Sequence, residues 1–149
     1  MAHIHEEIRI QAPIEVVYRL FCDTARHREM LPEGIETNFS GPIDQVGTTF
    51  DYRVRLPSGF DLGPQRNVVA EVEPLRLIRV IDSEGGQMLY QFEPDGRGTR
   101  LTVDADHELA GVFGKIPLRV VVDGAIDRGI RLMDEKVKSM AEAEVRILA

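Results

Sequence analysis

The sequence predicts an α+β fold in which a seven-stranded antiparallel sheet curls around one long C-terminal helix. Two observations carry this prediction. Apolar and polar residues alternate from about Gly34 to Gly111, and apolar residues recur every three or four positions from Ile116 onward. The first pattern is typical of strands with one buried face, and the second of a helix with one buried side. A chain of 149 residues fits one domain, which we expect to span residues 1–149.

The N-terminal part predicts one strand and two short helices. In HIHEEIRIQAP, the residues Ile4, Glu6, Ile8 and Ile10 share one face, and Pro13 ends the strand. Proline suits the start of a helix, so a helix is expected next. Its apolar stripe is Val16, Val17, Leu20 and Phe21. The segment CDTARHREMLP predicts a second short helix that ends at Pro32.

Six further segments alternate with period two and predict strands: GIETNFSG, TTFDYRVRLP, RNVVAEVEP, LRLIRVID, QMLYQFEPDG and RLTVDADHELAG. Turn-forming residues separate several of them, for example in EGG and PDGRG, so an antiparallel meander is expected. The predicted inward residues include Phe39, Phe50, Tyr52, Val54, Val68, Ala70, Val72, Met88, Tyr90, Phe92, Leu101, Val103, Ala105 and His107. In LRLIRVID either column could face inward, so the facing of residues 77–81 stays open.

The final segment predicts one long helix that begins near Ile116. Its apolar stripe is Leu118, Val121, Val122, Ala125, Ile126, Met133, Val137, Met140 and Ala141. The buried face of a seven-stranded sheet must be covered, and this helix is the only element long enough. Gly129 would leave room for a cavity if it faces the sheet, whereas close packing of helix on sheet is the alternative.

Three segments, taken in order, carry a resemblance to a known superfamily. IRIQAPIEVVYRLFCD, EVEPLRLIRV and RLMDEKVKSMAEAE resemble the opening strand and helix, a strand-turn-strand joint and the last helix of the SRPBCC, START and Bet v 1-like proteins. Within this superfamily, the chain resembles the polyketide cyclase-dehydrase-like branch. The resemblance implies a helix-grip fold with a cavity between sheet and helix. It also implies ligands such as lipids, sterols, quinones or polyketides.

Composition excludes several classes of partner. The net charge of −7 argues against nucleic acid, whose phosphates require clustered Lys and Arg. No segment approaches the roughly 20 apolar residues of a membrane span. The single Cys22 lies in an apolar helical stretch, where we expect it to be buried and inert. A cytoplasmic protein without integral membrane association is therefore expected.

The predicted ligand-binding residues are the inward ones of the sheet and the long helix: Phe39, Phe50, Tyr52, Val54, Met88, Tyr90, Phe92, Val103, His107, Ile126, Gly129 and Met133. His107 is a polar residue in an apolar column, so it is either a structural histidine, a rim residue or an acid/base group. Glu6 also interrupts an apolar column, and antiparallel pairing of the first and last strands would bring it near His107. Arg79 is expected to be solvated.

No metal site or cofactor is expected. In DADHE, Asp104 and Asp106 lie on the opposite strand face from His107, so the three cannot chelate one metal. In HIHEE, His3 and His5 lie on the polar face and lack the spacing of a zinc-protease motif.

The sequence therefore predicts a protein that binds a hydrophobic or amphipathic small molecule in an internal cavity. One alternative is a polyketide cyclase/dehydratase that uses His107, Glu6 or a tyrosine as acid/base. A second alternative is a protein-interaction domain with a filled core. A binding role is preferred because no catalytic constellation is legible, and a homodimer is left open.

Overall fold

The computed structural model describes residues 2–31, 35–55, 61–83, 85–107 and 116–148. Side chains are outside this description at residues 2, 28, 35, 52, 54–55, 61–65, 107, 116–129 and 148. The elements, in chain order, are β1 (Ala2–Ile10), α1 (Ile14–Cys22), α2 (His27–Met30), β2 (Ile35–Phe39), β3 (Thr49–Arg55), β4 (Asp61–Glu73), β5 (Leu77–Asp82), β6 (Gln87–Asp95), β7 (Gly98–His107) and α4 (Ile116–Leu148).

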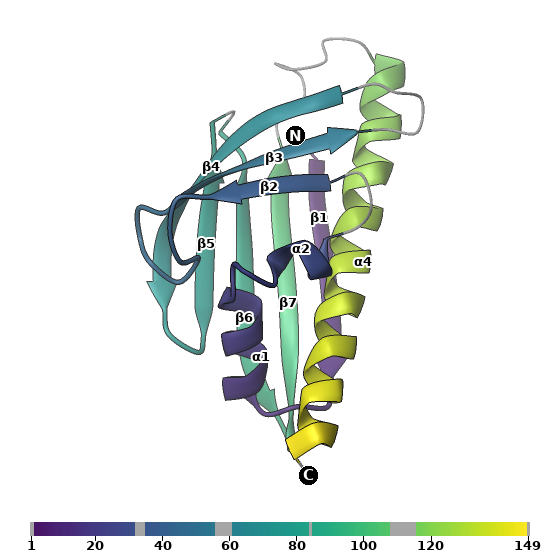
Figure 1. The fold of residues 1–149 in the computed structure, drawn as a ribbon. Helices are drawn as coiled ribbons and strands as arrows, with labels where there is room; N and C mark the ends of the chain where they lie inside the picture. The colour runs from purple at the N-terminus through teal and green to yellow at the C-terminus, as the bar shows by residue number, and fades with distance from the viewer. Residues whose placement is uncertain (1, 32–34, 56–60, 84, 108–115, 149) are drawn as a thin grey trace.

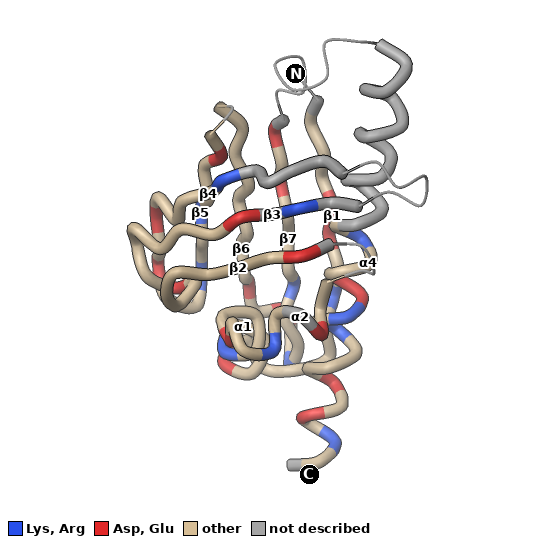
Figure 2. The backbone as a smooth tube through the Cα atoms, turned by 45° about the horizontal axis from the view of Figure 1, so that its top comes forward, with Lys and Arg blue, Asp and Glu red and all other residues tan. Residues whose placement is uncertain are grey.

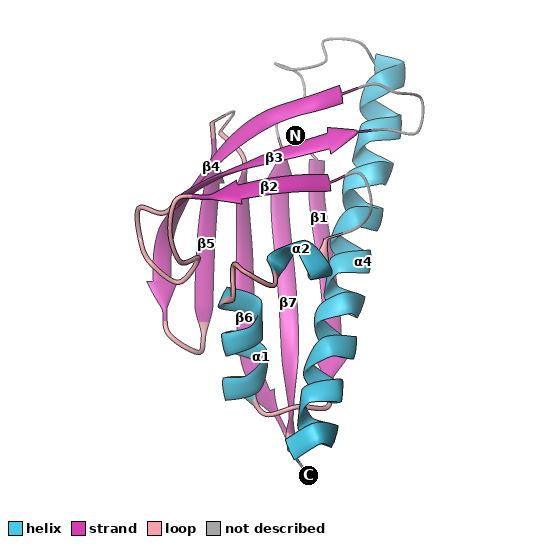
Figure 3. Cartoon of the chain, viewed as in Figure 1, coloured by secondary structure: helices cyan, strands magenta, loops and turns pink. Residues whose placement is uncertain are grey.

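The strands form one antiparallel sheet in the order β1-β7-β6-β5-β4-β3-β2. The sheet curls so strongly that β2 and β3 run across the direction of β6 and β7, which gives a half-barrel (Figure 1). Helices α1, α2 and α4 lie on its concave side (Figure 3). The predicted α+β helix-grip fold is confirmed, including the long C-terminal helix and the short helices after the first strand.

The predicted alternation is confirmed on β6 and β7 at the centre of the sheet. Their inward residues are the buried Tyr90, Phe92, Leu101, Val103 and Ala105. The open question about β5 is resolved, because Ile78, Val80 and Asp82 are buried. Arg79 lies on the other face, where its Nε donates to Glu71 Oε1 at 3.2 Å. It is therefore a surface ion-pair residue, in keeping with the expected solvated position.

Strand β4 departs from the sequence prediction. The buried residues are Asn67 and Val69, whereas Val68 and Ala70 are only half-buried. The register against β5 shifts between Val69 and Glu71. A β-bulge of this kind adds a residue to one strand and reverses which column faces inward beyond it. The prediction is therefore wrong for Val68 and Ala70, while Val72, beyond the bulge, packs against the core.

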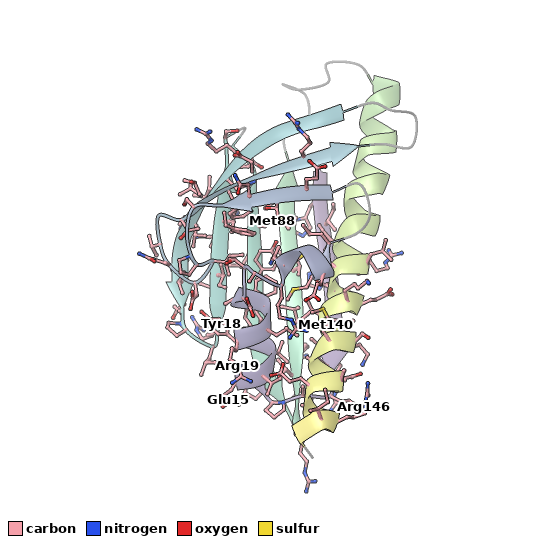
Figure 4. The ribbon with its side chains drawn as sticks, viewed as in Figure 1. Glu15, Tyr18, Arg19, Met88, Met140 and Arg146 are labelled. Carbon is pink, nitrogen blue, oxygen red and sulfur yellow. The ribbon has the colours of Figure 1, made fainter. Side chains whose placement is uncertain are left out.

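The described half of α4 presents an apolar stripe to the sheet. Met133, Val137 and Ala141 are buried, as predicted, and Met140, labelled in Figure 4, packs against the core from a partly buried position. Acidic and basic residues are both present along α4 toward the C-terminus (Figure 2). No helix in the described part of the chain is long and apolar enough to cross a membrane.

The turn between β5 and β6 requires glycine at one position. A Cβ at Gly86 would collide with the Asp82 carboxylate and with the Asp106 carbonyl. The Gly86 N–H instead donates to Asp82 Oδ1 at 2.8 Å, so the buried Asp82 has a partner. The EGG turn therefore depends on close backbone approach at its second glycine.

Candidate functional site

The concave face of the sheet brings together the predicted lining residues whose side chains are described. Phe50, Tyr90, Phe92, Val103 and Met133 are buried. Phe39 and Met88 are partly buried and pack against the same core cluster, and Met88 is labelled on β6 in Figure 4. Their arrangement fits an apolar inner surface, and their contact with a ligand stays a prediction.

The side chains of five predicted site residues lie outside the description: Tyr52, Val54, His107, Ile126 and Gly129. The backbone register nevertheless tests the expected pair of Glu6 and His107. His107 lies opposite Ala2, and Glu6 lies opposite Val103. Val103 and His107 are four residues apart on β7, which places Glu6 about 13 Å from His107 along the strands. The prediction that Glu6 and His107 lie close together is therefore wrong. The first and last strands are neighbours, but their register offsets these two residues.

Aromatic rings gather beneath α1 and α2, and we call this group the aromatic cluster. It consists of Tyr18, Phe21, His27, Phe39, Phe50, Tyr90 and Phe92. The ring centroids of Phe21 and Tyr90 are 4.8 Å apart, and those of Phe21 and Phe92 are 5.3 Å apart. These are the distances of close aromatic packing, so the cluster forms the dense part of the core.

His27, on α2, is buried in the aromatic cluster and is absent from the predicted site residues. Its side chain is fully buried, and its ring lies 4.9 Å from the ring of Phe39. Neither ring nitrogen has a hydrogen-bond partner of good geometry among the described residues. Burial lowers the pKa of His27 to about 4, and the nearby Phe21 carbonyl opposes this only in part. His27 is therefore neutral at physiological pH.

Helix α4 packs along β1, and polar residues line this contact, which we call the α4–β1 seam. Its members are Glu6, Arg9, Gln11, Arg131, Asp134, Lys138 and Glu142. Lys138 Nζ donates to the Arg9 carbonyl at 3.1 Å and to Glu142 Oε1 at 2.6 Å. The Gln11 N–H also donates to Glu142 Oε1, at 3.0 Å. This end of the seam is thus hydrogen-bonded across the two elements.

Asp134 is the exception in the α4–β1 seam. It is only 4% exposed, and its Oδ2 has no hydrogen-bond partner among the described residues. Burial raises the pKa of Asp134 to about 7, and the charges of Glu6 and Glu135 add to the effect. The carboxyl group can therefore be protonated or ionised near neutral pH, which suits it to hydrogen bonding or proton transfer.

Glu6 acts on Asp134 through its charge and pairs with a residue at the surface. Its Oε1 accepts a hydrogen bond from Arg131 Nη2 at 3.3 Å. The Glu6 side chain is 21% exposed and that of Arg131 is 54% exposed. The prediction that Glu6 faces inward is confirmed by its contact with α4, although its partner is Arg131 rather than His107.

Asp134 and His27 share a signal that the sequence reasoning did not use. Asp134 falls in the apolar stripe of its helix, four residues after the buried Ile130 and three before Val137. His27 likewise precedes the buried Met30 by three residues. Asp134 and His27 are thus polar residues at positions where the helical period predicts apolar ones, just as Glu6 interrupts the apolar column of its strand.

Cys22 lies at the end of α1 and is partly buried. Burial, followed by the negative charge of Asp44, raises the pKa of its thiol to about 12. The thiol is therefore protonated at neutral pH and is a poor nucleophile. This agrees with the inert role expected from the sequence.

The outer face of β1 and β7 carries histidines paired with carboxylates. His3 Nδ1 lies 2.6 Å from Asp106 Oδ1, and His5 Nδ1 lies 2.6 Å from Asp104 Oδ1. The exposed His3 and His5 share the polar face, as predicted. Among the described residues, no three or more His, Cys, Asp or Glu side chains are grouped to hold a metal ion.

No protein-family model and no curated protein matches this chain. Solved structures do match it. TTHA0849 from Thermus thermophilus has a TM-score of 0.74 at 20% identity, over 96% of this chain and 99% of that one. CV1439 from Chromobacterium violaceum has a TM-score of 0.68 at 17% identity, over 95% and 99%. The Aha1 dimer from Colwellia psychrerythraea has a TM-score of 0.66 at 16% identity, over 95% and 97%. At these identities the likenesses establish the fold alone, and this fold is compatible with ligand binding.

Proposed function

We propose that this protein binds a hydrophobic or amphipathic small molecule between the concave face of the sheet and α4. The observation that carries the proposal is Asp134, a buried carboxyl group without a hydrogen-bond partner for Oδ2 in the described structure. Buried polar groups are normally hydrogen-bonded, and an unpaired one is costly. A ligand that supplies the missing partner accounts for such a group at the edge of the apolar inner face.

The sequence resemblance to SRPBCC, START and Bet v 1-like proteins supports the same proposal, because it implies a ligand cavity at this place. Apolar burial would provide most of the binding free energy, at roughly 25 cal/mol per Å². Lipids, quinones and polyketides are the ligand classes that the resemblance implies.

Native mass spectrometry after mild purification tests the proposal directly. We expect a mass increment from a co-purified lipophilic molecule, or binding of the neutral apolar dye Nile red once that molecule is extracted. Failure to bind any apolar molecule would contradict the proposal and favour an interaction domain with a filled core.

A pair of variants locates the binding surface. Met88 is partly buried on the inner face of β6, and the adjacent Gln87 is exposed. Met88→Trp should weaken Nile red binding about tenfold or more, because the larger side chain fills space that a ligand needs. Gln87→Trp is the control on the same strand and should bind as the unmodified protein does. Equal binding by both variants would place the ligand elsewhere.

A cyclase or dehydratase acting on a polyketide is the second candidate. The observation that favours it is again Asp134, whose pKa of about 7 suits transfer of a proton in either direction. An enzyme of this kind would convert a bound polyketide, and Asp134→Asn would reduce its turnover about a hundredfold or more. Release of the polyketide unchanged would exclude this alternative.

A further inference from the structure

The chemistry around Asp134 restricts the ligand's polar group, if the proposed binding function holds. In the ionised form of Asp134, Oδ2 is an acceptor that lacks a donor in the described structure. The neighbouring polar groups of the α4–β1 seam are already engaged: Lys138 with Glu142, and Arg131 with Glu6. The donor that Asp134 lacks must therefore come from a bound molecule or from water, and the proposed binding function assigns it to a bound molecule.

The charges around Asp134 indicate which kind of polar group can approach it. The carboxylates of Glu6 and Glu135 both act on Asp134 and are of the same sign. Arg131, the cation that meets Glu6, has a side chain that is 54% exposed. Above about pH 7, where Asp134 is ionised, a carboxylate placed beside it would meet like charge in a poorly solvated place, which is unfavourable. A neutral donor would avoid this repulsion, and a cationic donor would be attracted by the same carboxylates.

The residues on either side indicate where the rest of such a ligand would lie. Asp134 is flanked on α4 by the buried Met133 and Val137. Glu6 is flanked on β1 by the partly buried Ile4 and Ile8, which pack against the core. A polar head at Asp134 would therefore continue directly into an apolar tail on the concave face.

We propose that the ligand of this protein is an amphiphile whose head is a hydrogen-bond donor, an alcohol or an amine, that binds at Asp134. Amphiphiles with a free carboxylate head are disfavoured at this site. Asp134 acts as the residue that selects the ligand's head, and the apolar inner face binds its tail. The inference rests on the proposed function and adds to it the chemistry of the head group.

Three matched amphiphiles test this inference by displacement of Nile red at about pH 8, where Asp134 is ionised: dodecanol, dodecylamine and dodecanoate, each below its solubility limit or critical micelle concentration. We expect dodecanol or dodecylamine to displace the dye at a concentration about tenfold lower than dodecanoate, the effect of one hydrogen bond to a charged group. Asp134→Asn should remove most of this preference. Glu15→Gln changes an exposed carboxylate on α1, outside the α4–β1 seam, and should preserve it.

The pH dependence distinguishes the two donor heads. Between about pH 5.5 and pH 8.5 Asp134 ionises, while the amine remains a cation. Binding of dodecylamine should therefore strengthen about tenfold over this range if the head is an amine. Stronger binding of dodecanol, without such strengthening, would assign an alcohol.

The outcomes separate this inference from the proposed function. Dye binding with equal displacement by all three heads, or with dodecanoate preferred, would overturn the inference and leave the binding function intact. Absence of binding by Nile red and by every amphiphile would overturn both. The head preference of the unmodified protein is decisive by itself, so the test stands even if Asp134→Asn is poorly folded.

Discussion

The aromatic cluster and the α4–β1 seam lie on the same concave side of the sheet, yet burial shifts the pKa values of their ionisable groups in opposite directions. In the aromatic cluster, His27 is surrounded by rings and is held neutral, with its pKa lowered to about 4. In the seam, burial raises the pKa of Asp134 to about 7, and the charges of Glu6 and Glu135 add to this effect. Both groups disfavour their charged form because burial removes solvation.

The difference indicates which region is structural and which is available for function. The rings of the aromatic cluster contact one another from α1, β2, β3 and β6, so they hold several elements together. The seam instead leaves Asp134 with an unpartnered oxygen at a place where a single further donor would satisfy it. A neutral imidazole can remain in a packed core, whereas a carboxyl group that titrates near pH 7 suits exchange of a proton or a partner.

The largest expected effect is loss of packing in the aromatic cluster. Phe21→Ala should lower the free energy of unfolding by about 3–5 kcal/mol, because the ring is fully buried against Tyr90 and Phe92. Urea denaturation measures this change. Phe21→Leu, at a smaller cost, serves if the alanine variant does not fold, and Leu132→Ala on the exposed side of α4 is the control. A cost below about 1 kcal/mol for the alanine variant would show that the cluster is loosely packed.

The second effect concerns the buried carboxyl of the seam. Since the pKa of Asp134 is raised on folding, its contribution to stability is greatest below about pH 4 and is lost as pH rises through about 7. Asp134→Asn should therefore stabilise the protein at about pH 8 by up to about 4 kcal/mol, and by little near pH 4. Urea denaturation at both pH values tests this.

Glu15→Gln is the control for Asp134→Asn, because it removes a carboxylate from an exposed residue outside the α4–β1 seam. Its effect on stability should be small at both pH values. Equal effects of the two substitutions would show that general charge, and not burial of Asp134, determines the pH dependence.

His27 produces the next effect, with the opposite sign. Its pKa is lowered on folding, so its unfavourable contribution appears as pH falls from about 6.5 to about 4. His27→Phe should raise stability near pH 4 by about 2–3 kcal/mol and change it little above pH 7. The unmodified protein should vary little between these limits, because the contributions of His27 and Asp134 oppose each other. If the stability of His27→Phe changed as little between pH 7 and pH 4 as that of the unmodified protein, this interpretation would be contradicted.

The order of the elements could be predicted from the sequence because their periodicities are strong and their boundaries carry turn residues. The inward columns of β6 and β7 follow from period two alone. On β4 the same reasoning is wrong, since a bulge between Val69 and Glu71 reverses the column and leaves no reliable mark in one sequence. Long-range register likewise separates Glu6 from His107, although the two strands are neighbours as predicted.

The predicted site is incomplete for a related reason. Pattern reasoning assigns Asp and His to the solvent side of a helix, so it does not single out Asp134 or His27. Their burial results from contacts with β1 and with the aromatic rings, which are distant in sequence. The burial of the apolar inner face could be predicted because an apolar residue type by itself indicates burial. A polar residue type does not indicate burial.

The smallest effect concerns an exposed carboxylate that serves as a reference for Asp134. Asp104 accepts a hydrogen bond from the exposed His5 and raises the pKa of that imidazole, mainly through this hydrogen bond and then through its charge. Asp104→Asn should therefore lower the pKa of His5 toward its ordinary value, as measured by NMR titration of the imidazole protons. Asp95→Asn, which removes a carboxylate paired with Arg9 on β1, should not.

The response to salt then distinguishes the effect of Asp104, at the surface, from that of the buried Asp134. At about 1 M salt the screening length is roughly 3 Å, so the part of the His5 shift that comes from charge should shrink. The stabilisation produced by His5 is present at low pH and is lost as pH rises through its raised pKa, and salt should weaken it. The pKa of Asp134 is raised mainly by burial, so it should change far less. Equal salt sensitivity of the two groups would show that the Asp134 carboxyl is solvated, and would remove the distinction between the seam and the surface.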